Sequence, residues 1–155
     1  MNYNDLALAE EESKLTAALK ESRNLLIEAP TGSGKSLFIP YFLSKHCKGR
    51  VVVLQPRRIA ALALAQFSAR LHGEPCGKTV GYQFRQESCK SADTRILFQT
   101  YGNFLHCVDS SREHILTAHT VGHTHHMRSV SNNHTVKAKF FAQKVGHNLF
   151  AESSR

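Results

Sequence analysis

The chain carries Ala29-Pro30-Thr31-Gly32-Ser33-Gly34-Lys35-Ser36 directly after the apolar run Leu25–Ile27. This order, a strand followed by a glycine-rich loop and then Lys-Ser, is typical of a loop that binds phosphate. Gly32 and Gly34 lack a Cβ, so the backbone can turn successive N–H groups toward phosphate oxygens at the positive end of a helix beginning near Lys35. We expect Lys35 to reach the β- and γ-phosphates and Ser36 to place its hydroxyl on Mg²⁺.

Two features qualify this interpretation. Ala29 stands where the strict pattern has glycine, although a small residue still fits there. The competing interpretation is a Gly/Ser turn between a strand and a helix that happens to end in Lys-Ser.

The composition is that of a globular, basic protein. The 155 residues are 41% hydrophobic and carry a formal net charge of +8, which is compatible with a polyanionic partner such as nucleic acid and equally with a basic surface that binds none. No run of about 18 apolar residues occurs, and the acidic N-terminal region has no signal-peptide pattern, so we expect a cytoplasmic chain without a membrane span. Its four widely spaced cysteines favour reduced thiols over disulfides or a zinc site.

Apolar patterns alternate between the strand and helix types along the first two-thirds of the chain. They predict strands at 25–28, 51–54, 79–84 and 95–99 and helices at 6–19, 35–46, 57–71 and 101–108. Pro40 is expected to kink or locally unwind the second helix. This order predicts the α/β class, a parallel sheet with flanking helices.

Two arginines follow the β-branched run at 51–54, in the sequence Gln55-Pro56-Arg57-Arg58. They would lie at the carboxyl edge of the sheet, where open α/β sheets bind ligands. A planar, permanently charged guanidinium suits phosphate, so we expect contact with a nucleic-acid backbone without base reading. The alternative is that both merely occupy the first turn of a helix.

Four blocks in this order resemble the start of a DEAH-type ATP-dependent helicase, closest to the bacterial HrpB-like branch. They are APTGSGKS at 29–36, LQPRRIAA at 54–61, VGYQFR at 80–85 and TYG at 100–102. The resemblance covers about residues 5–108 and implies part of one RecA-like P-loop NTPase lobe. It implies that 29–36 binds ATP and Mg²⁺, and that Pro56, Arg57 and Arg58, together with Thr100 and Gly102, touch nucleic acid, RNA more than DNA. The family often carries an acidic residue where Tyr101 stands.

The acidic residues of that family's next motif are missing. Phosphoryl transfer needs a carboxylate to help hold Mg²⁺ and a second one to activate water, and the family has both in an Asp-Glu pair. After residue 100 this chain has only Asp109, Glu113 and Glu152, and no two are adjacent. The second lobe is missing as well, so we expect ATP binding without unwinding by this chain alone.

The composition changes after about residue 108. Seven of the ten histidines follow it, and neither apolar periodicity nor turn signals continue. We therefore divide the chain into a partial helicase domain at 1–108 and an irregular, His-rich tail at 109–155 that is either disordered or read in an altered frame. A metal site built on His119, His123, His125 and His126 is a less favoured alternative.

Three function classes stay open at this point. The first is an ATP-dependent helicase fragment, the second a non-catalytic nucleotide-binding P-loop module, and the third a small P-loop kinase. The arginines after 51–54 favour the first, because a kinase would need an arginine-rich lid, which the sequence does not show. Weak binding to an RNA or DNA backbone is expected, and no protein partner is indicated.

Overall fold

A computed structural model describes residues 2–21, 24–30, 32–47, 49–108, 115–121 and 137–144. Two short 3₁₀ turns, Tyr3–Asp5 and Ala7–Glu11, lead into the first helix. The helices are α1 (Glu12–Glu21), α2 (Lys35–His46), α3 (Arg58–Leu71) and α4 (Tyr101–Val108). The strands are β1 (Asn24–Pro30), β2 (Arg50–Gln55), β3 (Val80–Gln83), β4 (Ser88–Cys89), β5 (Ile96–Thr100), β6 (Ile115–Val121) and β7 (Lys137–Lys144).

All seven strands form one sheet in the order β1-β7-β6-β2-β5-β3-β4. β6, β2, β5 and β3 pair in parallel, whereas β7 runs antiparallel to both β1 and β6, and β4 runs antiparallel to β3. β1 therefore points in the same direction as β2. This confirms the expected parallel-dominated α/β fold.

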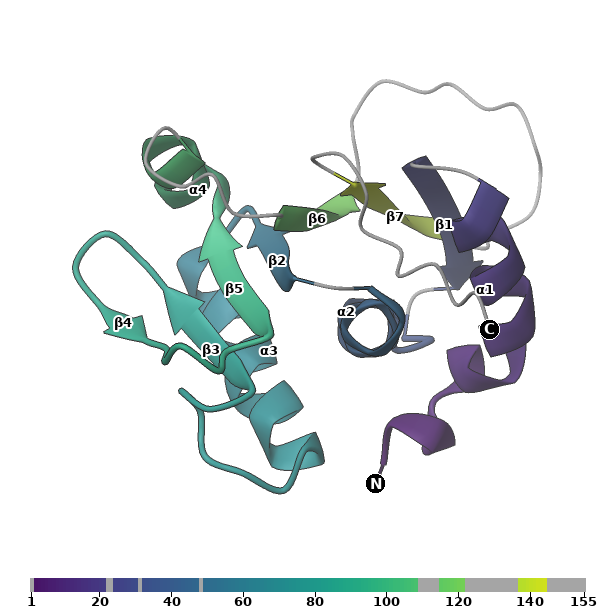
Figure 1. Ribbon diagram of the computed structural model, residues 1–155, viewed down its shortest axis with the longest axis horizontal. Helices are drawn as coiled ribbons and strands as arrows, with labels where there is room; N and C mark the ends of the chain where they lie inside the picture. Colours follow the sequence, from purple (N-terminus) through teal and green to yellow (C-terminus); the bar gives the residue numbers. More distant parts are fainter. Residues whose placement is uncertain are drawn as a thin grey trace, which may run out of the picture.

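The path of the chain explains why α2 and α3 share one face of the sheet. β1, β2 and β3 follow one another in a single direction across the sheet, and crossovers between parallel strands have one hand, so α2 and α3 lie on the same side. Figure 1 shows α2 and α3 within the curve of the sheet, α1 beside β1 at its edge, and α4 beyond the carboxyl end of β5. No helix in the described part of the chain is long and apolar enough to cross a membrane.

The main core lies between this face and its helices. β2 and β5 are buried along most of their length, as expected of central strands. Val51 and Val53 of β2 pack with Ile96 and Phe98 of β5 against the apolar sides of the helices. The helices contribute Leu15, Leu19, Phe38, Ile39, Phe42, Leu43, Ala61, Ala65 and Ala69.

The structure differs from the sequence-based expectations in three places. The predicted helix at 6–19 begins as 3₁₀ turns, and α2 continues through Pro40 as an unbroken helix, so the local unwinding expected there does not occur. The segment after 108 is not irregular throughout, because β6 and β7 enter the sheet between β1 and β2. There β7 pairs with β1 and β6 pairs with β2, so the backbone groups of β1 and β2 have hydrogen-bond partners. The remaining tail residues, His123, His125 and His126 among them, lie outside the described residues.

Candidate functional site

The glycine-rich loop connects the end of β1 to the start of α2. Gly32 and Gly34 have φ values of +85° and +80°, a backbone region that residues with a Cβ rarely adopt. The turn closes with a hydrogen bond from the Ser33 N–H to the Pro30 carbonyl at 3.3 Å. Gly34 caps α2, and its carbonyl accepts from Leu37 and Phe38. The N–H groups of the first helical turn are thereby directed at the loop.

Lys35 places its ammonium group inside the curve of this loop. Its side chain is only 6% exposed, and Nζ donates to the carbonyl oxygens of Ala29 and Pro30, both at 2.6 Å, and to Ser33 Oγ at 3.1 Å. Burial lowers the pKa of this lysine. A cation held among the loop's oxygens, next to a helix N-terminus, suits an incoming phosphate.

The N-terminal segment supports the loop from outside. A Cβ added to Gly34 would lie 2.9 Å from Cδ2 of Leu6, so a side chain here would displace Leu6 in addition to straining the backbone. Leu6 is itself buried. Tyr3 fixes the same segment, because its ring stacks on Tyr41 at 3.8 Å between centroids and its hydroxyl bonds Ser68 Oγ at 2.7 Å.

The ends of β2 and β5 meet at the same edge of the sheet as the loop. Gln55 and Thr100 are register partners, so the residues that follow them start from adjacent points. Pro56 and Arg57 are exposed directly after β2, and Gly102 is exposed in the first turn of α4. Two strands, β6 and β7, separate this pair from β1. The candidate phosphate site and the candidate nucleic-acid site thus share one edge but are distinct.

The two arginines of this edge have different surroundings. Arg57 is the N-cap of α3, and we find no partner for it among the described residues. Arg58 pairs with the Glu87 carboxylate and lies 5.2 Å from the centroid of the Phe84 ring. The Tyr82 hydroxyl donates to the same carboxylate at 2.7 Å. Arg58 therefore joins α3 to the turn between β3 and β4.

The ionisation of this cluster follows from its contacts. The hydrogen bond to Glu87 raises the pKa of Tyr82 to about 12. The same bond, helped by Arg58, lowers the pKa of Glu87. The carboxylate is therefore charged at neutral pH and offsets the charge of Arg58, so Arg57 is more available to a phosphate than Arg58 is.

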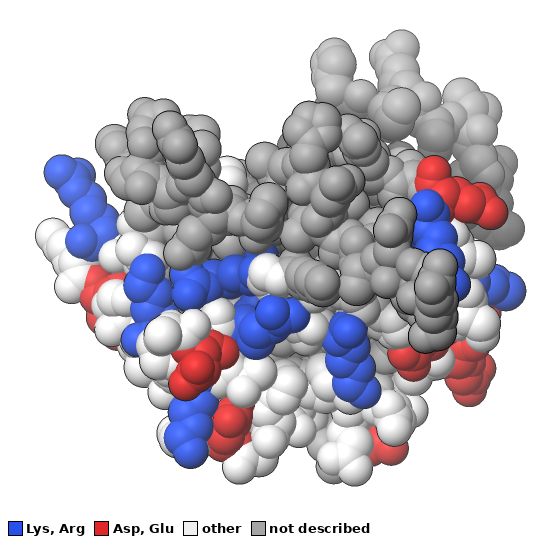
Figure 2. Space-filling model, in the orientation of Figure 1, with Lys and Arg blue, Asp and Glu red and all other residues white. Residues whose placement is uncertain are grey.

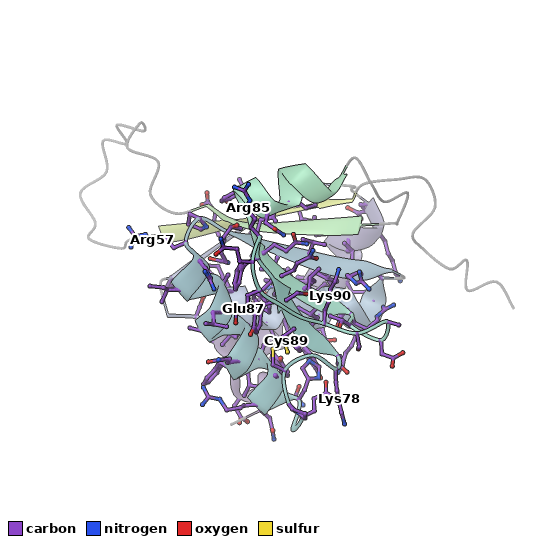
Figure 3. The ribbon with its side chains drawn as sticks, turned by 90° about the vertical axis from the view of Figure 1, so that its left-hand side faces the viewer. Arg57, Lys78, Arg85, Glu87, Cys89 and Lys90 are labelled. Carbon is purple, nitrogen blue, oxygen red and sulfur yellow. The ribbon has the colours of Figure 1, made fainter. Side chains whose placement is uncertain are left out.

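Basic side chains gather on this half of the molecule. Figure 2 shows a band of Lys and Arg over the part that contains β2, β3 and β5, with acidic groups scattered around it. Figure 3 shows Arg57 and Arg85 near the carboxyl edge of the sheet, with Glu87 and Lys90 further along the β3–β4 side. Such a surface suits a phosphodiester backbone.

The structure describes most of the residues expected at the two sites. Ala29, Gly32, Ser33, Gly34, Lys35 and Ser36 lie together in the loop, whereas Thr31 lies outside the described residues. Ser36, the residue expected to bind Mg²⁺, is half-buried at the second position of α2. Sequence reasoning missed Leu6 and Glu87, because both act through contacts distant in sequence. Among the described residues no group of three or more metal-binding side chains occurs.

A family model for the DEAD/DEAH box helicase matches residues 11–130. The chain belongs to this family. The match continues past Val108, so it covers more of the chain than the four sequence blocks did.

Individual relatives agree with this assignment. The ATP-dependent RNA helicase HrpB of Escherichia coli (strain K12) is 41% identical over 91 residues, which are 57% of this chain and 11% of that protein. The ATP-dependent RNA helicase HrpA of Borreliella burgdorferi is 36% identical over 108 residues, 68% of this chain and 13% of that protein. A crystal structure of the Escherichia coli DEAH/RHA helicase HrpB matches with a TM-score of 0.59 and 39% identity, covering 63% of this chain and 13% of that one. The chain thus spans a small part of the length of these relatives.

Proposed function

We propose that this chain binds ATP with Mg²⁺ through the loop Ala29–Ser36 and holds an RNA backbone at the adjoining ends of β2 and β5. The observation that carries the proposal is the placement of Lys35, a buried cation at the start of a helix, inside a loop with two glycines of positive φ. This arrangement supplies the charge and the backbone donors that a triphosphate needs.

The residues of the loop fit a nucleotide better than they fit a complete metal site. Gly34 leaves no room for a side chain, and Lys35 lies within 3.1 Å of three oxygen acceptors that a phosphate would replace. Ser36 would give Mg²⁺ one of its oxygen ligands, and the phosphates and water would supply others. Mg²⁺ would neutralise phosphate charge when bound, while Lys35 and the loop amides orient the triphosphate.

The RNA assignment rests on the charge of the surface and on the names of the relatives. Arg57, at the N-terminus of α3, and the neighbouring basic band lie on the same edge as the loop. The curated relatives are named ATP-dependent RNA helicases. The second candidate function is a P-loop module that binds nucleotide without hydrolysis, which the lack of an adjacent Asp-Glu pair after residue 100 favours. The cytoplasmic location stays a prediction.

Calorimetry with ATP and Mg²⁺ tests the nucleotide site. We expect Lys35→Ala to lower the affinity at least tenfold, because it removes a charge-assisted contact of about 1.5–3 kcal/mol. Lys45→Ala, in the last turn of the same helix, is the matched control and should leave the affinity unchanged. Equal affinity in the native chain and Lys35→Ala would mean that the loop is only a turn.

A further inference from the structure

Two cysteines that are distant from the nucleotide loop lie against each other. Cys76 lies in the loop after α3, and Cys89 lies on β4, 13 positions later. The Cys89 thiol donates a hydrogen bond to the backbone carbonyl oxygen of Cys76 at 3.3 Å, which brings the two residues into contact. Both cysteines are free, and both residues are half-buried rather than enclosed in the core. Figure 3 shows Cys89 between Glu87 and Lys78 on the β3–β4 side of the molecule.

Two glycines hold these cysteines together. Gly77 has φ +104°, and its N–H donates to the Val80 carbonyl at 2.7 Å, which turns the loop back toward β3. A Cβ on Gly77 would lie 3.0 Å from Cys89 Sγ, and one on Gly81 would lie 2.5 Å from the Cys89 carbonyl oxygen. The backbone around Cys89 is therefore packed against both glycines, and the thiol contact is built into the fold rather than left to a mobile surface.

We propose that Cys76 and Cys89 form a redox-active dithiol that a small disulfide oxidant, such as oxidised glutathione, converts to an intramolecular disulfide. In the first step the Cys89 thiolate attacks one sulfur of the oxidant, and one glutathione thiolate leaves. In the second step the Cys76 thiolate attacks Cys89 Sγ, and the second glutathione leaves. The protein loses two protons and two electrons, and the oxidant becomes two glutathione thiols.

The surroundings assign the order of these steps. Burial raises the pKa of Cys76 to about 11, and the neighbouring Cys89 adds to this effect. Cys76 is therefore protonated at neutral pH and is a poor first nucleophile, since the thiolate is the reactive form. It acts second, on a sulfur that is already held next to it.

The disulfide would restrain the turn between β3 and β4, in which Glu87 pairs with Arg58. Cys89 is the register partner of Tyr82, and Tyr82 donates to the Glu87 carboxylate that pairs with Arg58. A covalent link from Cys89 to the loop after α3 would limit the separation of β4 from β3. Oxidation is therefore expected to stabilise this side of the molecule, and reduction to release it.

Mass spectrometry of the full chain tests the proposal. After incubation with oxidised glutathione, we expect the intact mass to fall by two hydrogens and the proteolytic map to link the peptides of Cys76 and Cys89. The melting temperature should rise by roughly 5 °C, as for a closed loop of similar length, and return after dithiothreitol.

The Cys76→Ser variant distinguishes formation of the intramolecular disulfide from simple reaction of one thiol with glutathione. Cys76→Ser should keep one glutathione on Cys89, because the second nucleophile is gone, whereas the native chain should keep none. A stable glutathione adduct on the native chain, a disulfide through Cys47 or Cys107, or no oxidation at all would overturn the proposal. If the serine variant does not fold, the peptide map of the native chain decides by itself.

Discussion

At the scale of single residues, the loop depends on Gly34 for two separate reasons. Its φ of +80° disfavours any side chain, and its missing Cβ leaves room for Leu6. Gly32 has a similar φ of +85°, but no atom lies within 4 Å of a Cβ built there. Substitution of Gly32 therefore measures backbone strain alone, whereas substitution of Gly34 measures backbone strain together with the contact to Leu6.

We predict that Gly34→Ala lowers the free energy of unfolding more than Gly32→Ala does. Gly32→Ala should cost about 1–2 kcal/mol through backbone strain alone. Gly34→Ala adds the clash with Leu6, so its extra cost should shrink in a Leu6→Ala background. Chemical denaturation of the native chain, the three single variants and the two double variants that combine Leu6→Ala with either glycine substitution measures these terms. Equal costs for both glycines in both backgrounds would show that Leu6 does not support the loop.

The second residue-scale prediction concerns His72, which lies against the rings of Tyr3 and Tyr41. Its Nε2 is buried and has no hydrogen-bond partner in the described structure. Burial is the main cause that lowers its pKa; Glu74 acts against this effect and Lys45 adds to it. The folded protein thus holds a neutral ring, whereas the unfolded chain takes up a proton near pH 6.5.

Stability should therefore fall as the pH drops below about 6.5, toward the lower folded pKa of His72. We expect the melting temperature to decrease between about pH 7.5 and 5.5, and to decrease less in His72→Phe, which keeps a ring without the titrating nitrogen. The native chain and the variant are compared by thermal denaturation at both pH values. An identical decrease in the two chains would assign the pH dependence to other groups.

At the scale of elements, the junction of β2 and α3 divides two roles between adjacent arginines. Arg57 is the exposed N-cap, and Arg58 joins α3 to the β3–β4 turn through Glu87. We expect Arg57→Ala to weaken binding to a labelled single-stranded RNA, and to reduce the slope of log affinity against log salt by about one, without changing the melting temperature.

Arg58→Ala should do the reverse. It should lower the melting temperature and change the salt slope little, and Glu87→Gln should reproduce the loss of stability. Fluorescence anisotropy over a salt series, together with thermal denaturation, measures both effects. If Arg58→Ala and Arg57→Ala reduce the salt slope equally, both arginines contact phosphate and the division of roles is wrong.

The sequence predicted the elements whose signals are local. The loop, β2, α3 and α4 follow from runs of neighbouring residues, and each lies within a few residues of its predicted position. β6 and β7 were missed because their pairing joins residues distant in sequence, which periodicity does not report. β4 was missed because its two residues are too few to show a periodic pattern. The partner of Arg58 was missed for the same reason, since Glu87 lies 29 positions away.

At the scale of the whole molecule, we predict that the chain binds ATP and RNA but neither hydrolyses ATP above background nor separates a duplex. After residue 100 the only acidic residues are Asp109, Glu113 and Glu152, so no adjacent pair is present to hold Mg²⁺ and activate water. We expect phosphate release by the 155-residue chain near background, with or without RNA, and no ATP-dependent separation of a labelled duplex. Duplex separation by the pure chain would assign the metal and water roles to Asp109 or Glu113.

The division of the chain at residue 108 stays a prediction. The family model reaches residue 130, which lies beyond that division. Reading the genomic DNA after codon 108 in all frames tests the altered-frame hypothesis. An Asp-Glu-x-His block in another frame would support it, and its absence would favour a tail read in its own frame.

The place of β1 in the sheet also affects how this protein is made. The strand that delivers the loop has β7 as its neighbour, and Asn24–Pro30 pairs with Gln143–Lys137. During synthesis on a ribosome, β1 emerges long before β7 exists, while β2, β5 and β3 can already pair with one another. Contacts between residues so distant in sequence form slowly. We therefore expect the nucleotide loop to reach its native conformation late, after β2, β5 and β3 have paired.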